Sequence, residues 1–373
     1  MPDPIPLFEI DHTPTDVAYV TESIERGAYW ANGPFIDRFE SALAAYVGVE
    51  HAITVNSGTT ALVAALVGLG VEPGDTVIVP SFTFIATASA VRLAGATPVF
   101  ADIESDTLGL DPAAVATAVD ETTVGIIPVH PYGAPCAIDA ICAVAAEYDL
   151  FVLEDAAEAL GATADGRMLG AVGDAAALSF CQNKITPTGE GGAVLTDDAA
   201  VAERVARYRS HGRASADYFE RPDSGRYVTL GTNIRMSDMT AALGCAQLER
   251  IDRLIADRRR VAQTYADRLA GVDGVTPHTP PPEGTHVYQL YTVIFDDADD
   301  RPVVVDALAD AEIASKVYWD PPVHRTEAYG EWAQDSALAV TDEIAACVLS
   351  LPMHPTLTDE EVDRVVDVIA ESV

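Results

Sequence analysis

The stretch AAALSFCQNKITPTGEGGAVL, residues 175–195, places a polar, glycine-rich loop between two short apolar runs. The runs 175–180 and 193–195 predict buried strands, because each is almost wholly apolar and too short for a helix. The loop contains Lys184, one of two lysines in the chain, the other being Lys316. Catalytic groups often lie in loops held by rigid elements, so Lys184 is either a merely tolerated lysine or a reactive one, and its surroundings decide.

Short apolar runs also alternate with helical patterns along the amino-terminal part of the chain. The expected strands are 51–55, 76–79, 97–100, 124–127 and 150–153, and the expected helices are 36–47, 61–69, 83–93 and 137–148. This alternation predicts an α/β fold in which helices cover both faces of a mostly parallel sheet. Ligands of such sheets bind beyond the carboxyl ends of the strands.

The pattern changes in the carboxyl-terminal part. A long helical stretch runs from Met236 to Val261, and it is followed by a proline-rich segment, a strand and two helices, expected at 276–284, 288–295, 303–311 and 359–369. We therefore expect a large α/β domain with an amino-terminal arm over residues 1–250, and a smaller α+β domain over residues 251–373.

The charge balance is strongly acidic. The 373 residues include 58 Asp and Glu against 22 Lys and Arg, a net charge of −36. Such a field repels nucleic acid and anionic membranes, so neither is an expected partner. The acidic residues are spread through an otherwise apolar chain, which indicates a halophilic surface adapted to high salt. The alternative is an acidic face for a cationic partner.

Several features indicate a cytoplasmic enzyme rather than a secreted or membrane protein. No run of about 18 apolar residues is present, and the start Met1-Pro2-Asp3-Pro4 lacks the pattern of a signal peptide. The five cysteines are scattered, without the spacing of a metal site or a disulfide framework, so we expect reduced thiols and no metal.

Polar motifs follow two of the expected strands. Asn56-Ser57-Gly58-Thr59 stands at a strand-to-helix junction, where backbone N–H groups and the helix dipole attract anions; an ordinary helix cap is the alternative. Phe84, in Pro80-Ser81-Phe82-Thr83-Phe84, follows the next strand. Its ring either stacks on a planar ligand or belongs to the core.

Two acids, Glu154 and Asp155, end the strand at 150–153. Buried carboxylates must be solvated or paired, and one here could keep a pyridinium nitrogen protonated, which turns that ring into an electron sink. A metal site and a simple helix cap are the alternatives, although no histidine cluster accompanies the motif. Lys184 could form an imine with an aldehyde cofactor and then move a proton, provided that a desolvated cleft helps its amine to lose its own.

Taken in order, the motifs resemble those of a known family. NSGTTAL, PSFTFIAT, EDAAEALG, SFCQNKITPTGEGG, NIRMSDMTAALGCAQLERID and LPMHPTLTDEEVDRV are similar to the DegT/DnrJ/StrS family of nucleotide-sugar aminotransferases, from about Gly33 to the end. The resemblance implies the aspartate-aminotransferase fold (fold type I), the cofactor pyridoxal 5'-phosphate, and a homodimer whose active sites are shared between subunits.

The resemblance also implies roles for single residues around the cofactor. Lys184 would carry it, Asp155 would pair with the pyridine nitrogen, and Phe84 would stack on the ring. Glu158 would lie near the ring oxygen, and with TGEGG it resembles the branch, typified by perosamine synthase, that aminates carbon 4.

The remaining roles concern the phosphate and the substrate. Gly58, Thr59 and Ser179 would hold the cofactor phosphate, and Asn233 would reach the phosphate in the neighbouring subunit. The substrate residues would be Arg235 and His324, with Arg213 and Arg325 as further candidates for the diphosphate. Cys181-Gln182 and Pro187 depart from the usual family pattern beside the lysine, which concerns the sugar rather than the cofactor.

The expected reaction is transfer of an amino group, with glutamate as the expected donor, to a nucleotide-linked keto-deoxy sugar for glycan or surface polysaccharide synthesis. Relatives that are sugar dehydratases have histidine at the lysine position, and Lys184 argues against that activity. Two alternatives stay open: an aminotransferase for a cyclitol or another ketone without a nucleotide, and a regulatory protein that binds the cofactor without turnover.

Overall fold

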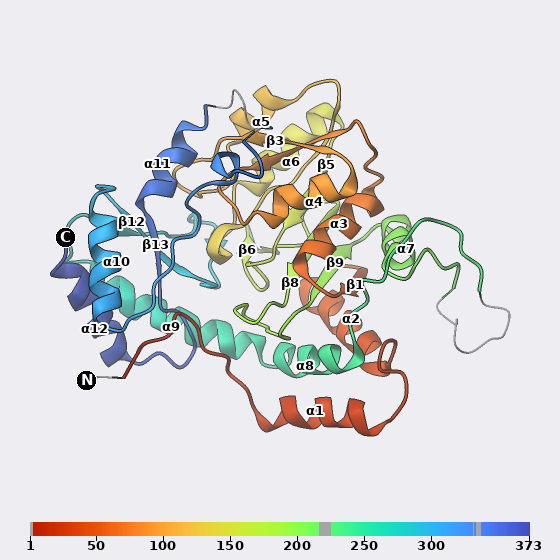
Figure 1. Cartoon of the computed structure of the whole chain (residues 1–373), viewed down its shortest axis with the longest axis horizontal. Coiled ribbons are helices and arrows are strands. Elements are labelled where there is room, and N and C mark those ends of the chain that lie inside the picture. The colour runs from red at the N-terminus through yellow and green to blue at the C-terminus, as the bar shows by residue number, and fades with distance from the viewer. Residues whose placement is uncertain (1–2, 216–224, 331, 333–336) are drawn as a thin grey trace.

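The computed structural model describes residues 3–215, 225–330, 332 and 337–373 of the chain. Its centre is a seven-stranded sheet in the order β1-β9-β8-β5-β4-β2-β3 (Figure 1). The strands are β1 (His51–Val55), β2 (Thr76–Pro80), β3 (Thr97–Ala101), β4 (Thr123–Ile126), β5 (Phe151–Asp155), β8 (Ala175–Ser179) and β9 (Gly192–Thr196). β9 is antiparallel to both of its neighbours, β1 and β8, and the other neighbouring strands in this sheet pair in parallel. The mostly parallel α/β sheet predicted from the alternating pattern is thus confirmed.

Helices cover both faces of the sheet, because each face is apolar and needs a partner. They are α2 (Pro34–Val47), α3 (Gly58–Leu69), α4 (Ala86–Ala94), α5 (Pro112–Ala118), α6 (Ile138–Tyr148), α7 (Ala199–Tyr208) and α8 (Asp238–Leu248). Leu43 and Ile141 belong to the core on one face, and Leu66 and Val205 to the core on the other. The amino-terminal helix α1 (Pro14–Glu25) packs against α8, and no periodic apolar pattern had predicted it.

The carboxyl-terminal part has its own core. It contains α9 (Ile251–Leu269), α10 (Asp300–Asp310), α11 (Ala339–Cys347) and α12 (Asp359–Ala370), beside an antiparallel sheet of β10 (Val275–Pro277), β12 (Tyr291–Phe295) and β13 (Val348–Leu351). Ile5 is buried in this core and pairs with Ile313, so the amino-terminal end lies against the carboxyl-terminal part. The division at residue 250 remains a prediction.

Three two-residue strands form a separate small sheet that joins distant parts of the chain. They are β6 (Thr163–Ala164), β7 (Arg167–Met168) and β11 (Gly284–Thr285). Short 3₁₀ turns occur at Pro131–Gly133 and Val323–Arg325. Within the described residues, no helix is long and apolar enough to cross a membrane.

Two expected helices differ from the observed ones in ways that shape the site. The helix expected at 83–93 begins three residues later, at Ala86, because Thr83, Phe84 and Ile85 form the turn out of β2. The long helical stretch from residue 236 is two helices, α8 and α9, interrupted at Arg250, whose φ of −122° and ψ of 13° are not helical.

Candidate active site

A cavity of about 380 Å³ opens beyond the carboxyl ends of the parallel strands. Residues at or soon after the carboxyl ends of β1, β2, β5 and β8 line it, since the carboxyl ends of parallel strands meet at one edge of a sheet. Seven predicted site residues lie on its wall: Gly58, Thr59, Phe84, Asp155, Glu158, Ser179 and Lys184. Four motifs far apart in the sequence thus converge on one space.

Lys184 and Glu158 form an ion pair inside this cavity. Lys184 Nζ lies 2.9 Å from Glu158 Oε1, and the two side chains are 14% and 13% exposed. The second oxygen of Glu158, Oε2, accepts a hydrogen bond of 3.0 Å from the backbone N–H of Tyr132. Glu158 is therefore held from two sides and fixes the position of the lysine amine.

Asp155 ends β5 and forms the buried floor of the cavity. Its Oδ2 accepts a hydrogen bond of 2.8 Å from the Thr87 hydroxyl, and its Oδ1 accepts one of 3.3 Å from Ala157 N. Burial raises the pKa of Asp155 above its ordinary value, more than these hydrogen bonds lower it. Burial thus disfavours the ionised carboxylate, and a cation placed beside Asp155 would stabilise it.

The amino-terminal end of α3 forms the opposite wall. Ser57 caps the helix by accepting a hydrogen bond from Thr60 N, and Gly58 and Thr59 are the next two residues. A Cβ atom at Gly58 would come within 2.8 Å of Ser179 Cβ, so glycine permits the close approach of α3 to the end of β8. This helix terminus beside the Ser179 hydroxyl suits a phosphate.

Aromatic side chains close the remaining sides. Phe84 is 59% exposed and lies on the cavity wall, as its place in the turn before α4 allows. Tyr318 and Trp319 reach the cavity from the carboxyl-terminal part. The Trp319 ring stacks on Tyr132, with centroids 5.4 Å apart and planes 10° apart, and the Tyr132 hydroxyl donates to the Tyr318 carbonyl.

Three predicted site residues lie outside this cavity. Asn233 is exposed in the segment before α8. Arg235 lines a second cavity of about 190 Å³ and donates to Ser210 Oγ at 3.1 Å. His324 is buried, with Nδ1 2.6 Å from Ser81 Oγ and Nε2 3.2 Å from Asp342 Oδ1. The single chain therefore does not bring the predicted substrate residues to Lys184.

Sequence reasoning missed Thr87, Tyr132, Tyr318 and Trp319. Thr87 stands in the motif PSFTFIAT, which could have identified it. The helix was expected to begin at residue 83, however, so the turn that places Thr87 beside Asp155 was not foreseen. Tyr318 and Trp319 stand in an aperiodic loop more than 130 residues after Lys184, where only the folded chain shows their proximity.

Glu154, the neighbour of Asp155, points to the opposite side of the sheet, as alternation along a strand requires. Its side chain is fully buried. Oε1 accepts hydrogen bonds of 2.8 Å from the backbone of Val172 and Gly173, and Oε2 accepts one of 2.9 Å from Gly170 and contacts His130 Nε2 at 3.0 Å. The first of the two acids is structural, and only the second faces the cavity.

We expect Glu154→Ala to lower the free energy of unfolding by about 3–5 kcal/mol, because it leaves buried donors unpaired. Burial alone would raise the pKa of Glu154, but hydrogen bonds from His130 and the backbone outweigh it and lower the pKa. A depressed carboxyl pKa stabilises the fold above the unfolded value of 4.5, and this contribution disappears as the pH falls through the folded value. Urea denaturation at neutral and acid pH measures both effects.

The matched control is Glu203→Ala, because that side chain is 60% exposed and pairs with Arg207 within one helix. It should change the free energy of unfolding by less than about 0.5 kcal/mol. Equal losses for the two variants would contradict the structural role of Glu154.

The cavity fits a phosphorylated aromatic aldehyde. It offers an amine at Lys184, a buried carboxylate at Asp155 for a ring cation, and a helix terminus with the Ser179 hydroxyl for a phosphate. In the described ranges, no group of three or more His, Cys, Asp or Glu side chains could hold a metal ion.

Comparisons with known proteins agree with this chemistry. The model of the DegT/DnrJ/EryC1/StrS aminotransferase family matches residues 11–370. GDP-perosamine synthase of Caulobacter vibrioides is 40% identical over 355 residues, covering 93% of this chain and 92% of that protein.

Two solved structures are similar over almost their whole length. S. venezuelae DesV, in complex with a ketimine intermediate, has a TM-score of 0.90 at 34% identity and covers 99% of this chain and 98% of its own. 3-amino-5-hydroxybenzoic acid synthase has a TM-score of 0.90 at 30% identity and covers 97% of each chain.

Proposed function

The chain belongs to the DegT/DnrJ/EryC1/StrS family of pyridoxal-phosphate-dependent sugar aminotransferases, and from this premise we propose that it transfers an amino group from glutamate to carbon 4 of a nucleotide-linked keto-deoxy sugar. The observation that carries the proposal is the 2.9 Å contact of Lys184 Nζ with Glu158, in a cavity whose floor is Asp155. Transamination requires an amine that holds the cofactor and then moves a proton, and a carboxylate that keeps the cofactor ring nitrogen charged.

Each of these residues has a part in the proposal. When bound, pyridoxal phosphate supplies an aldehyde that binds amines and a ring that withdraws electrons from them. Lys184 holds it and, once displaced by the donor, moves the proton at the reacting carbon. Asp155 keeps the ring nitrogen charged, Phe84 covers the ring, and Gly58, Thr59 and Ser179 hold the phosphate.

Glu158 and the similarity to a GDP-perosamine synthase support amination at carbon 4. The carboxylate lies beside the lysine amine and is fixed by Tyr132 N, so it would keep a defined place near the reacting groups when cofactor and sugar are bound. The assignment to carbon 4 rather than carbon 3 is tested by the NMR spectrum of the product made from each keto isomer.

The first test of the proposal is the visible absorbance of the purified protein with bound cofactor, recorded before and after glutamate is added. We expect glutamate to bleach the band of the lysine-bound cofactor and to release 2-oxoglutarate in equal amount. A protein that takes up no cofactor would overturn the aminotransferase proposal. If the band is bleached by another amino acid and not by glutamate, the assignment of glutamate as the donor is overturned.

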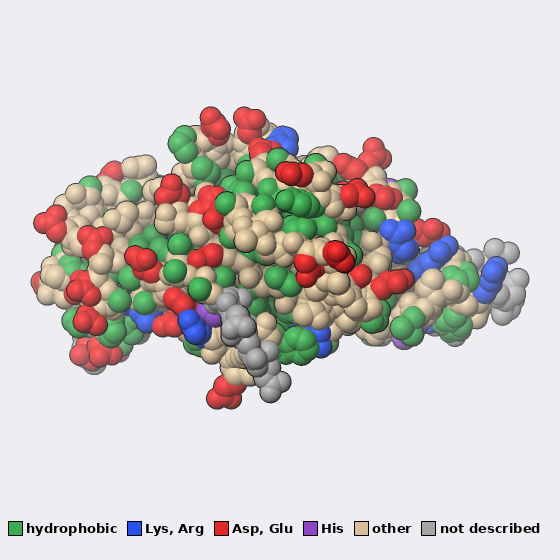
Figure 2. Space-filling model, turned by 90° about the horizontal axis from the view of Figure 1, so that it is seen from above, with side chains coloured by type: hydrophobic (Ala, Val, Ile, Leu, Met, Phe, Trp, Pro, Cys, Tyr) green, Lys and Arg blue, Asp and Glu red, His purple; other side chains and the backbone are tan. Residues whose placement is uncertain are grey.

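An anionic substrate needs a local positive site in a chain of net charge −36. The second cavity supplies one, because its lining includes the arginines Arg207, Arg209, Arg213 and Arg235. Burial and the neighbouring arginines lower the pKa of Arg235, so an anion would be favoured there. Several basic side chains gather at the end of the molecule that carries α7 (Figure 2). We assign the diphosphate to this cluster, acting on the partner's site in a homodimer.

The shape of the chain supports such a dimer. The described segment after α7 extends away from the body (Figure 1), and two of its apolar side chains, Leu230 and Tyr227, are 90% and 55% exposed. Asn233 is exposed at the base of this segment, where Ile234 O accepts a hydrogen bond of 2.8 Å from Asn56 N. In the proposal this segment enters the partner, and Asn233 reaches the partner's cofactor phosphate.

Leu230→Asp is expected to weaken the dimer, with Kd raised about tenfold or more, because it places a charge in an apolar contact. Sedimentation over a range of protein concentrations measures the change. Val303→Asp is the matched control, since Val303 is 53% exposed on α10 in the carboxyl-terminal part. If neither variant changes the dimer Kd, Leu230 does not lie in the interface.

A second candidate function is amination of a ketone that carries no nucleotide. The similarity to 3-amino-5-hydroxybenzoic acid synthase favours it, because the product for which that protein is named is an aromatic acid and not a sugar. Nucleoside diphosphates separate the two: a nucleotide-sugar enzyme should be inhibited competitively by GDP, UDP or dTDP. If none of them competes, the ketone without a nucleotide becomes the better assignment.

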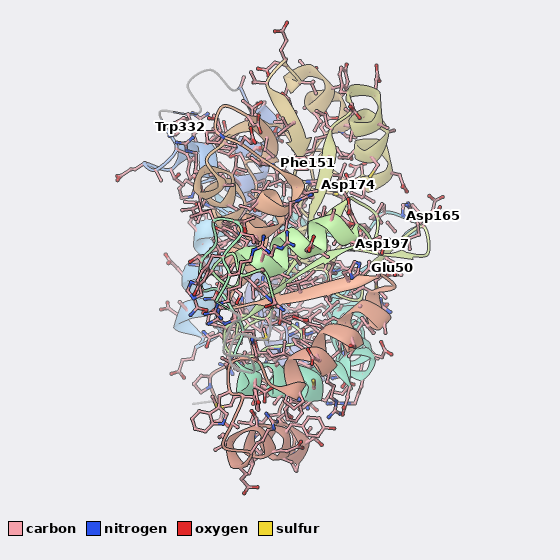
Figure 3. All side chains as sticks on the ribbon, turned by 90° about the vertical axis from the view of Figure 1, so that its right-hand side faces the viewer. Glu50, Phe151, Asp165, Asp174, Asp197 and Trp332 are labelled. Atoms are coloured by element: carbon pink, nitrogen blue, oxygen red, sulfur yellow. The ribbon has the colours of Figure 1, made fainter. Side chains whose placement is uncertain are left out.

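We propose also that the fold is adapted to high salt. Acidic side chains are scattered over the whole visible face (Figure 2), and Glu50, Asp165, Asp174 and Asp197 are exposed along one side (Figure 3). Raising NaCl from 0.1 M to 1 M shortens the screening length from about 10 Å to about 3 Å. We expect Tm to rise by roughly 5 °C or more, measured by calorimetry. Sucrose at equal osmolality is the control, and equal rises in both would contradict charge screening.

A further inference from the structure

Gln289 contacts the lysine loop from the carboxyl-terminal part of the chain. It precedes β12 by two residues and is 2% exposed. Its side-chain Nε2 donates a hydrogen bond of 2.7 Å to the backbone carbonyl of Asn183. Because Asn183 is the residue before Lys184 and lines the same cavity, this bond fixes the backbone from which the lysine side chain extends.

Gln289 is itself rigidly held. The buried guanidinium of Arg258, on α9, donates through Nη1 to the carbonyls of Tyr288, Gln289 and Met353 at 2.9, 3.4 and 3.2 Å. A buried guanidinium whose described partners are all neutral carbonyls has no carboxylate to balance its charge, and burying that charge costs free energy. Burial also lowers the pKa of Arg258 to about 10. Its contacts fix the backbone that presents the Gln289 amide.

The same segment also supports Glu158. Leu290 N donates to the Tyr132 carbonyl at 3.2 Å, and Val287 N donates to the Gly133 carbonyl at 3.0 Å. Tyr132 N in turn donates to Glu158 Oε2. Residues 287–290 therefore contact both sides of the ion pair, the lysine loop through Gln289 and the carboxylate through Tyr132.

We propose that Gln289 is a positioning residue, whose amide sets the distance and direction of the Lys184 amine relative to Glu158. This inference rests on the proposed role of Lys184 as the residue that holds the cofactor. The function of Gln289 is to keep the lysine nitrogen beside the Glu158 carboxylate, at the 2.9 Å separation seen in the structure. The amide contacts neither cofactor nor substrate in this arrangement.

The test is Gln289→Met in the holoenzyme, because methionine keeps the length and bulk of the side chain but has no N–H donor. The readout is the pH midpoint of the visible absorbance band of the bound cofactor. We expect this midpoint to fall by about 0.5–1 unit, because a looser Lys184 loses part of its contact with Glu158. Turnover should fall while KM for the amino donor changes little.

Gln247→Met is the matched control. Gln247 is 1% exposed, and its amide donates to Asp11 O and Asp16 Oδ1, on the amino-terminal arm and α1. It should lower Tm and leave the pH midpoint unchanged, so a general loss of packing is separated from a change at the lysine. Gln289→Asn, which withdraws the amide by one methylene, replaces Gln289→Met if that variant does not fold, and it should shift the midpoint in the same direction.

The outcomes distinguish this inference from the function on which it rests. If Lys184→Ala abolishes the band and the folded Gln289 variant keeps the wild-type midpoint, the positioning role is overturned and the aminotransferase assignment stands. If Lys184→Ala keeps the band, the proposed function fails first.

Discussion

Lys184→Ala should lower the rate of amino transfer by about four orders of magnitude or more. In the proposed function, the variant would lose both the amine that holds the cofactor and the base that moves the proton, and none of the other residues described around the cavity carries an amine. The rate of 2-oxoglutarate release measures the loss, and the visible spectrum shows whether cofactor is bound in the same form.

Lys316→Ala is the control for this variant, because Lys316 is the other lysine and is exposed. It should keep the wild-type rate and spectrum. Methylamine added to Lys184→Ala should restore a small part of the rate, since a free amine can take over the proton transfer. A variant that retains more than about a tenth of the wild-type rate would show that another group does this work.

Asp155→Ala should lower turnover by about 10²–10³-fold, which is the usual cost of removing one preorganised group that stabilises developing charge. Burial raises the pKa of Asp155, so a neighbouring cation would stabilise its ionised carboxylate. The cofactor ring nitrogen would be that cation. Without Asp155, the ring would lose its proton near neutral pH. We expect weaker cofactor binding and a lower turnover together.

Two further variants define the effect at Asp155. Thr87→Val removes the hydroxyl that donates to Asp155 Oδ2, and it should cost less than Asp155→Ala because the carboxylate remains. Asp139→Asn is the neutral control, as that side chain is 59% exposed on the surface. Stopped-flow measurement of the first half-reaction separates cofactor affinity from the chemical step. Wild-type turnover in Asp155→Ala would remove this residue from the mechanism.

The sheet and the cofactor side of the cavity were predictable because they depend on local patterns. A run such as His51–Val55 reads as a strand by itself, and the observed β1 has those bounds. The α/β pattern predicts that ligand-binding residues follow the ends of the strands, and the family resemblance of their motifs implied that Asp155, Ser179 and Gly58 share one site. The positions of these residues in the cavity therefore needed no knowledge of distant contacts.

The substrate side was less predictable because it depends on contacts between distant segments. Trp319 and Gln289 reach the site from the carboxyl-terminal part, through loops whose sequences have no period. His324 was expected at the substrate, but its ring is buried against Ser81 and Asp342. Arg235 and Asn233 lie away from the cavity of their own chain, so any part they play at the site depends on the proposed dimer.

The two lysines differ sharply in their surroundings. Lys184 is inside the cavity with its side chain 14% exposed, whereas Lys316 is exposed on the carboxyl-terminal part. A reagent that acylates amines would consequently find one side chain on the outer surface, besides the amino terminus. The protein can thus be attached to a support or given a fluorescent label at Lys316 without any substitution, and the cofactor would shield Lys184 during the coupling.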